Sequence, residues 1–194
     1  MSERLVEQAR RGDADAFVAL IEERQVAMTR VATAILGNPA DVADALQETL
    51  LSLWHDLPSL RSVDAFPAWA DRILVNACRL VLRRRARTRI REIALPEDLA
   101  SLGQGAPSES AISFDRAVAE REAFDRAFET LEPAGRAILV LHHLEDRSVA
   151  EIATVFGIPV GTAKSRLFKA RRDLEVALAL EASPPISAEP EPNR

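Results

Sequence analysis

The sequence predicts an all-α protein built from two small helical domains joined by a flexible linker, with a helix-turn-helix in the C-terminal domain. Apolar residues recur at the three- and four-residue spacing of helices along most of the 194 residues. Strand signals are scarce, because the chain has no Tyr, only 7 Gly and no sustained two-residue alternation. Between the two helical stretches this periodicity fades among Pro, Gly and Ser residues, which is typical of a linker.

The composition shift sets the expected domain boundaries. We expect residues 1–91 to form the first domain, residues 92–112 the linker and residues 113–180 the second domain. Residues 181–194 contain four prolines and three acidic residues, and this composition predicts a disordered tail.

Helix-stopping residues divide the first domain into separate predicted helices. Gly12-Asp13 interrupts the first amphipathic stretch, and Gly37-Asn38-Pro39 ends the next helix because Gly favours a helix end and Pro prevents continuation. The predicted segments are a broken stretch from Leu5 to Ile21, helices over Val26–Leu36, Asp41–Trp54 and Ala65–Arg89, and a loop over Pro58–Asp64.

The composition also disfavours several classes of protein. No apolar run approaches the ~20 residues of a membrane span, and the N-terminus does not resemble a signal peptide, so we expect a cytoplasmic protein. Cys78 is the only cysteine, which excludes an internal disulfide and any cysteine-cluster metal site. The three histidines are His55 and the adjacent pair His142 and His143, a poor metal pair. We therefore expect no enzyme activity, metal, cofactor or small-molecule substrate.

Charge alternates in blocks along the chain, although the overall net charge is only −5. Residues 61–91 carry nine basic and two acidic side chains, and residues 147–180 carry six and three. Residues 1–60 have a net charge of −5, and residues 92–146 a net charge of −8. The two basic blocks can each neutralise phosphates, whereas the acidic blocks suit other partners.

The most specific local pattern is a helix-turn-helix over residues 148–172. Ser148 and Glu151 have the spacing of a capping box, in which each side chain bonds the other residue's backbone amide. Ala153 is small where two helices cross closely, and Gly157 suits a tight turn that needs a left-handed residue. Pro159 can serve as the first residue of the second helix.

The second helix of this motif is basic. From residue 159 to residue 172 it has five basic side chains and no acidic one. Such a helix suits the major groove of DNA, where its N-terminal residues reach base edges and its later residues reach phosphates. The alternative is a solvated helical hairpin with a basic surface, but the coincidence of cap, small residue, turn and basic helix favours DNA binding.

A second candidate for DNA contact is the arginine-rich end of the helix predicted over 65–89. No acidic residue interrupts the stretch from Arg79 to Arg91, and dense like charge on a helix is costly unless a polyanion relieves it. A merely solvated helix end is the alternative. Phe66 and Trp69, one turn apart, suit either core packing or stacking on unpaired bases, and their place on an apolar stripe favours the core.

Two stretches of the chain resemble bacterial sigma factors of the extracytoplasmic-function (ECF) group. The first includes Asp41-Val42-Ala43-Asp44-Ala45-Leu46-Gln47-Glu48-Thr49-Leu50 and the later residues Phe66, Trp69, Asn76 and Arg83-Arg84, and is similar to the family's second conserved region. The second includes Glu151-Ile152-Ala153 and Gly157-Ile158-Pro159-Val160-Gly161-Thr162-Ala163-Lys164-Ser165-Arg166, and is similar to its fourth. Together the stretches cover roughly residues 5–90 and 115–178.

The resemblance implies three interfaces. The face that would bind core RNA polymerase comprises Asp44, Gln47, Glu48 and Leu51. The residues that would contact the −10 element are Arg61, Ser62, Asp64, Arg72, Asn76, Arg79, Arg83 and Arg84. Those that would contact the −35 element are Arg136, Ser148, Thr162, Lys164, Ser165, Arg166, Phe168, Lys169 and Arg172.

The resemblance implies partners as well. These are core RNA polymerase, through its β′ and β subunits, and promoter DNA; many members of the group are also held by an anti-sigma factor. Polymerase would hold the two domains at promoter spacing, and acids in the linker (Glu97, Asp98 and Glu109) would either mimic nucleic acid or form a plain spacer. Asp71 departs from the family's pattern and would bring a negative charge close to the melted strand.

One alternative function remains open at this point. A helix-turn-helix regulator that binds DNA by itself would account for residues 148–172, but it would leave residues 41–91 without a role.

Overall fold

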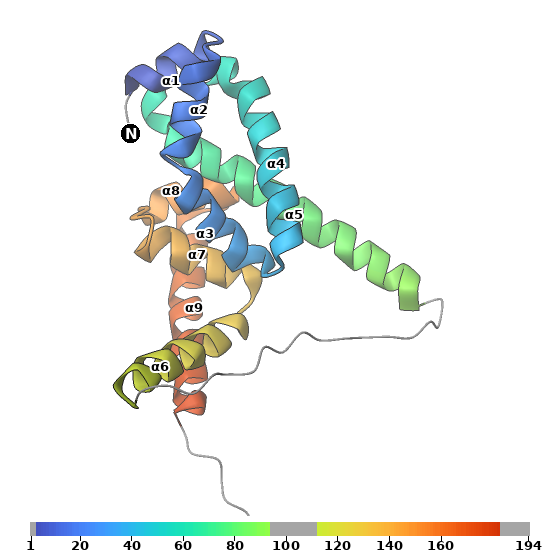
Figure 1. The fold of residues 1–194 in the computed structure, drawn as a ribbon, viewed down its shortest axis with the longest axis vertical. Helices are drawn as coiled ribbons and strands as arrows, with labels where there is room; N and C mark the ends of the chain where they lie inside the picture. Colours follow the sequence, from blue (N-terminus) through green and yellow to red (C-terminus); the bar gives the residue numbers. More distant parts are fainter. Residues whose placement is uncertain (1–2, 94–111, 183–194) are drawn as a thin grey trace, which may run out of the picture.

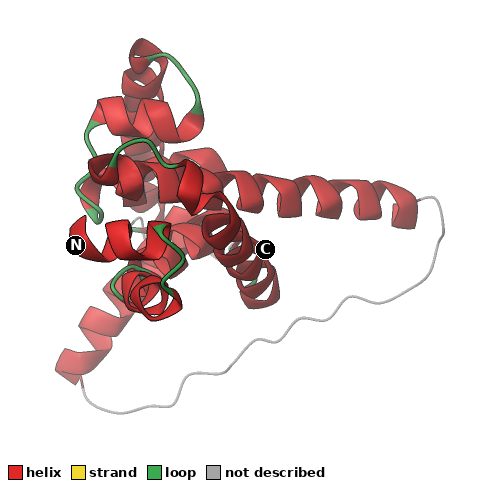
Figure 2. Ribbon diagram, turned by 90° about the horizontal axis from the view of Figure 1, so that it is seen from above, coloured by secondary structure: helices red, strands yellow, loops and turns green. Residues whose placement is uncertain are grey.

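A computed structural model describes residues 3–93 and 112–182, and the regular elements within these two ranges are all helical (Figures 1 and 2). The first range holds α1 (Glu3–Arg10), α2 (Ala14–Glu22), α3 (Gln25–Leu36), α4 (Pro39–Asp56), α5 (Phe66–Ile93) and short 3-10 turns over Leu57–Ser59 and Val63–Ala65. The second holds α6 (Ile112–Glu129), α7 (Pro133–His143), α8 (Val149–Phe156) and α9 (Val160–Glu181). The predicted all-α class is confirmed.

Side-chain caps start the helices at the predicted breaks. The Asp13 carboxylate accepts a hydrogen bond from the amide of Ala16 at 3.0 Å, and the Asn38 side chain accepts one from the amide of Ala40 at 2.9 Å. Each bond satisfies an amide that has no partner inside its helix. Gly37 ends α3 with a φ of 71°, in the region that favours glycine.

The first domain buries one apolar stripe from each of its helices. Phe66 and Leu74 on α5, Leu53 on α4 and Leu20 on α2 are all fully buried. Phe66 is therefore a core residue, as the sequence favoured, while Trp69 is half-buried beside it with ring centroids 6.0 Å apart. Cys78 is buried in the same core, and desolvation raises the pKa of its thiol to about 12.

The second domain forms its core where α7, α8 and α9 meet. Ile138 and Leu141 on α7, Ile152 on α8 and Ala163 on α9 are fully buried. Helix α6 packs along the C-terminal half of α9, where Arg126 pairs with Glu181 at 2.9 Å.

The two domains also pack against each other. Helix α7 lies against α3, and α8 lies against the N-terminal half of α5 (Figure 1). The C-terminal half of α5 projects away from both domains, as both ribbon views show.

The structure refines several predicted boundaries. Helix α5 extends to Ile93, past the predicted end at Arg89, and Pro159 is the cap before α9 rather than its first residue. The linker acids Glu97, Asp98 and Glu109 lie outside the described residues. So do residues 183–194, most of the predicted disordered tail.

The packing of Phe66 leads to a stability prediction. We expect Phe66→Ala to lower the free energy of unfolding by about 3–5 kcal/mol, because it removes a large ring from a fully buried site and leaves a cavity. Chemical denaturation followed by circular dichroism measures this loss. Val26→Ala, at a side chain that is 67% exposed, is the control and should change the value by no more than ~0.5 kcal/mol. Equal effects of the two substitutions would contradict the assigned core.

Candidate polymerase and DNA interfaces

Helix α4 presents an acidic face with an apolar edge. Asp44, Gln47, Glu48 and Leu51 are all exposed and follow the three- and four-residue spacing of one helix face. Trp54 extends this face by one more turn; it is 43% exposed and packs edge-on against Phe17, with ring centroids 5.0 Å apart. The sequence analysis did not include Trp54 in this face, although its position three residues after Leu51 could have indicated it.

The segment between α4 and α5 exposes three of the predicted −10 residues. Arg61, Ser62 and Asp64 are exposed, while Leu57 and Leu60 beside them are buried and anchor the segment to the core. The segment contains two short 3-10 turns rather than irregular loop alone.

One stripe of α5 brings the other predicted −10 residues together. Arg72, Asn76 and Arg83 are exposed, and Arg79 between them is half-buried. Arg79 donates to the Asn76 side chain at 3.4 Å, and Arg83 donates to the Arg79 carbonyl at 3.3 Å. Arg84 is also exposed on this helix.

The helix-turn-helix forms as the sequence predicted. The Ser148 hydroxyl accepts a bond from the amide of Glu151 at 3.2 Å, and the Glu151 carboxylate accepts one from the amide of Ser148 at 2.9 Å. Gly157 then adopts the left-handed conformation with a φ of 64°, which reverses the chain into α9. The Ser148 hydroxyl also donates to the Glu151 carboxylate at 2.7 Å, and this bond, followed by the one from the Ser148 amide, lowers the pKa of Glu151 below its usual value.

Helix α9 divides cleanly into a buried and an exposed face. Ala163, Leu167 and Ala170 are buried against the rest of the second domain. The half-buried Thr162 lies at the first turn, and the exposed predicted −35 residues are Lys164, Ser165, Arg166, Phe168, Lys169 and Arg172. Phe168 is 68% exposed on this side of the helix.

One side chain of this face is already paired within the helix. The Lys169 ammonium donates to Asp173 at 2.5 Å, and this contact raises the pKa of Lys169.

Arg136 occupies a different environment from the other predicted −35 residues. Its guanidinium donates to the carbonyls of Ala34 at 2.5 Å and Ile35 at 3.3 Å, both in the last turn of α3, and to two carbonyls of its own domain. The burial lowers the pKa of Arg136. A cation at the C-terminus of a helix is favourable because the last carbonyls lack helical partners. In this arrangement Arg136 therefore joins the two domains.

Asp71 requires a correction of the sequence analysis. Its side chain is only 3% exposed and accepts from Arg24 at 2.5 Å and from Arg147 at 2.8 Å. The charge expected near a melted DNA strand is instead neutralised between the two domains.

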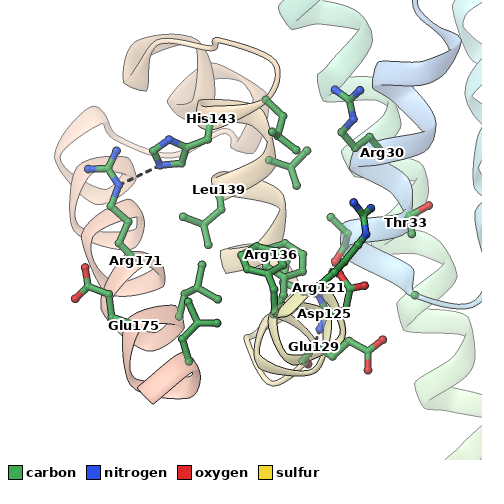
Figure 3. Close-up of a pocket in the computed structure, with 18 residues that line it drawn as sticks. Arg30, Thr33, Arg121, Asp125, Glu129, Arg136, Leu139, His143, Arg171 and Glu175 are labelled. Atoms are coloured by element: carbon green, nitrogen blue, oxygen red, sulfur yellow. Dashed lines mark hydrogen bonds between the residues drawn. The ribbon is translucent and has the colours of Figure 1, made fainter. Parts of the chain in front are cut away.

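A groove of about 1130 Å³ lies between α3, α6, α7 and α9 (Figure 3). Its lining includes Phe124, Phe128 and Leu139. Arg136 also lines the groove and donates to the Glu129 carbonyl at 2.8 Å. On the far side Arg171 donates to His143 at 3.2 Å.

Within the described ranges, no group of three or more His, Cys, Asp and Glu side chains could hold a metal ion. Nor does any described helix combine the length and apolar character needed to cross a bilayer.

Comparison with known proteins assigns both halves of the chain. The family described as Sigma-70 region 2 matches residues 20–88, and the family described as Sigma-70 region 4 matches residues 121–174. The ECF RNA polymerase sigma-E factor of Haemophilus influenzae is 31% identical over 178 residues, covering 88% of this chain and 92% of the relative. This chain belongs to the ECF group of RNA polymerase sigma factors.

Further relatives agree with this assignment. The ECF sigma-E factor of Escherichia coli is 30% identical over 88% of this chain and 91% of its own length. The solved structure of CnrH, in complex with the cytosolic domain of CnrY, superimposes with a TM-score of 0.62 at 25% identity, covering 92% of this chain and 97% of that chain. The sigma factor RpoE from Bartonella quintana, in complex with the anti-sigma factor NepR, has the same fold (TM-score 0.63, 21% identity, 84% of this chain, 98% of that chain).

The comparisons confirm the family resemblance and the function that it implied. The chain is an alternative sigma factor that directs transcription initiation, and sigma factors are initiation factors rather than enzymes. The match over residues 20–88 gives a role to the half of the chain that a stand-alone regulator left unexplained. The roles of individual residues stay predictions.

The capping box leads to a pH-dependent prediction. The pKa of Glu151 is lowered in the folded state, so its ionised form stabilises the fold above the unfolded pKa of ~4.3, and this contribution is lost as the pH falls through the folded pKa. We expect Glu151→Gln to lower the free energy of unfolding by about 0.3–1 kcal/mol at pH 7, because Gln can keep the cap but lacks the negative charge at the helix N-terminus, and by less at acid pH. Denaturation at both pH values measures the difference. The control is Glu175→Gln, which removes an exposed carboxylate of α9. If the loss in free energy of unfolding caused by Glu151→Gln were the same at both pH values, the assigned cap would be refuted.

Proposed function

We propose that the exposed face of α4 binds core RNA polymerase, through its β′ and β subunits. The face combines the acids Asp44 and Glu48 with the exposed apolar side chains Leu51 and Trp54. Carboxylates would repel DNA phosphates, whereas exposed apolar side chains beside charges suit a protein partner.

We propose that the segment 57–65 and the stripe on α5 contact the −10 element. The exposed Arg61 and Ser62 precede the helix, and Arg72, Asn76 and Arg83 follow along one face of it. Arginines spaced along one face can follow a phosphate backbone, and the short polar segment before the helix is suited to base contacts.

The exposed face of α9 is proposed to enter the major groove at the −35 element. The observation that carries this proposal is the capped turn from α8 into α9, which leaves Lys164, Arg166 and Lys169 exposed along the N-terminal half of α9. Arg166 is the best candidate for a base contact because Arg can pair bidentately with guanine.

An anti-sigma factor is proposed as a further partner. Both solved relatives are described with a bound protein, and the anti-sigma factor NepR is the partner of one. The apolar side chains that line the groove between α3, α6, α7 and α9 support the idea that this chain binds such a protein. Action on promoters also implies that the protein works in the cytoplasm.

The polymerase interface predicts the effect of a charge reversal. We expect Glu48→Lys to weaken binding to core polymerase at least about tenfold, because like charges opposed across an interface cost several kcal/mol. Co-purification and fluorescence anisotropy with core polymerase measure the affinity. Glu22→Lys, at an exposed position on α2, is the matched control. Unchanged affinity in Glu48→Lys would remove α4 from the interface.

The DNA interface is tested by in-vitro transcription with core polymerase on a promoter library. We expect new start sites that share two spaced elements, and Arg166→Ala should lower transcription from them about 5- to 150-fold, the equivalent of one lost bidentate contact. Arg121→Ala, which removes an exposed arginine of α6, is the control. Specific DNA binding by the protein alone, without new start sites, would instead favour the stand-alone regulator.

A further inference from the structure

Contacts between the two domains occupy arginines that are proposed to bind the promoter. Arg79, a proposed −10 residue, donates to the Phe156 carbonyl at 3.5 Å, and its guanidinium lies 5.1 Å from the centre of the Phe156 ring. Helix α8, which leads into α9, packs against α5 at this point. Burial, and then the charge of Arg166 on α9, lower the pKa of Arg79. Arg136, a proposed −35 residue, is bound to the end of α3.

Asp71 is the most deeply buried charged side chain at this interface. Its two oxygens divide between the domains: one accepts from Arg24 of the first domain, and the other accepts from Arg147, in the turn between α7 and α8 of the second. The side chains of Arg24 and Arg147 are only 10% and 14% exposed. A buried carboxylate needs such partners, because an unpaired charge in the interior is strongly destabilising.

A second ion pair lies across the same interface. Arg30 of α3 pairs with Glu145, just after α7, at 2.6 Å, and the Glu145 side chain is 13% exposed. The pairs Arg30–Glu145 and Asp71–Arg147 therefore both use residues of the segment 145–147. In this segment the second domain presents one acidic and one basic side chain, and each pairs with a residue of the first domain.

This arrangement is incompatible with simultaneous contact to both promoter elements. The names −10 and −35 place the elements about 25 base pairs apart, which is ~85 Å along B-form DNA at ~3.4 Å per base pair. Phe156, the last residue of α8, touches Arg79 directly, so the proposed −10 stripe and the start of the helix-turn-helix are in contact. The domains must separate before both elements are bound.

We propose that the ion pairs Asp71–Arg147 and Arg30–Glu145 form a latch that holds the free sigma factor closed. The latch keeps Arg79 and Arg136 in contacts between the domains and so withholds them from DNA until polymerase separates the domains. Opening leaves Asp71 paired with Arg24, so the first domain can stay folded while the latch is broken. The closure rests on the contacts alone, whereas its effect on DNA binding rests also on the proposed function.

The test compares two double variants of the full chain that lose the same residue types. Glu145→Gln with Arg147→Gln removes both latch pairs, and Arg126→Gln with Glu181→Gln removes an ion pair inside the second domain. Neither double variant changes the net charge. Thermal melting by circular dichroism establishes that each is folded.

Domain separation is measured by energy transfer between dyes attached at Val18→Cys on α2 and Val176→Cys on α9. Both positions are more than half exposed, and the buried Cys78 thiol does not compete for label. We expect the latch variant to show lower transfer than the parent, together with a larger radius of gyration by small-angle scattering. The control variant should match the parent. Equal transfer and equal size in all three proteins would overturn the latch.

The effect on DNA is measured without polymerase, with a duplex that carries the upstream element found by the transcription assay. Apparent affinity falls with the fraction of molecules that are competent to bind, so releasing a latch raises it even where open molecules are still a minority. We expect the latch variant to bind at least about thirtyfold more tightly, the fold-change that corresponds to one broken buried charge pair. The latch variant loses one acidic and one basic side chain, so a change in net charge cannot produce this gain.

A charge swap provides an independent test of the more exposed pair. Arg30→Glu and Glu145→Arg should each lower energy transfer, and the two together should restore it.

The outcomes separate the closure from its effect on DNA. If energy transfer shows separated domains in the latch variant but DNA affinity does not rise, the closure stands and its proposed effect on DNA is overturned. Absence of any shared promoter element in the transcription assay would instead count against the proposed function, because energy transfer reports on the latch without DNA.

Discussion

Burial of the apolar stripe of α5 is the constraint on which most of the structure depends. Phe66, Leu74 and Cys78 lie on this stripe and are fully buried, and α3, α4 and α8 all pack against the helix. A helix cannot bury an apolar face alone, so α5 draws its partners from both halves of the chain. The same helix carries the arginine stripe on its other side. Packing one face of α5 therefore fixes which arginines face solvent and which face the second domain.

The positions of α5 and α3 at the interface determine the polar contacts between the domains. Asp71 lies on the buried side of α5 and receives arginines from both domains, and Arg136 reaches the free carbonyls at the end of α3. Buried ion pairs contribute less to net stability than apolar packing does, but they tolerate few alternative partners. An interface built from ion pairs can fix one arrangement of the domains and can still dissociate when a partner competes for its surfaces. Such a balance suits the latch that we propose between the two domains.

The sequence predicted local features that depend on a few neighbouring residues. The capping box of Ser148 and Glu151, the left-handed Gly157 and the break at Gly37 all formed as expected, because capping and turn chemistry are decided within about four residues. The family assignment was also accessible, since the motifs of two regions occur in the right order. The boundaries were less exact: α5 ends four residues beyond its predicted end, because helix ends depend on weak terminal interactions.

By itself, then, the sequence determined the all-α class, the helix-turn-helix and the membership of the ECF sigma group. Only the tertiary structure decided the environments of Asp71, Arg79 and Arg136. Sequence analysis placed Asp71 near DNA and treated Arg136 as free for phosphate, whereas in the folded chain all three side chains contact the opposite domain. Residues 71 and 147 are far apart in sequence, and no local pattern indicates that α5 meets the turn between α7 and α8. Which charges become partners is set by how two apolar faces pack, and that depends on long-range shape rather than on local periodicity.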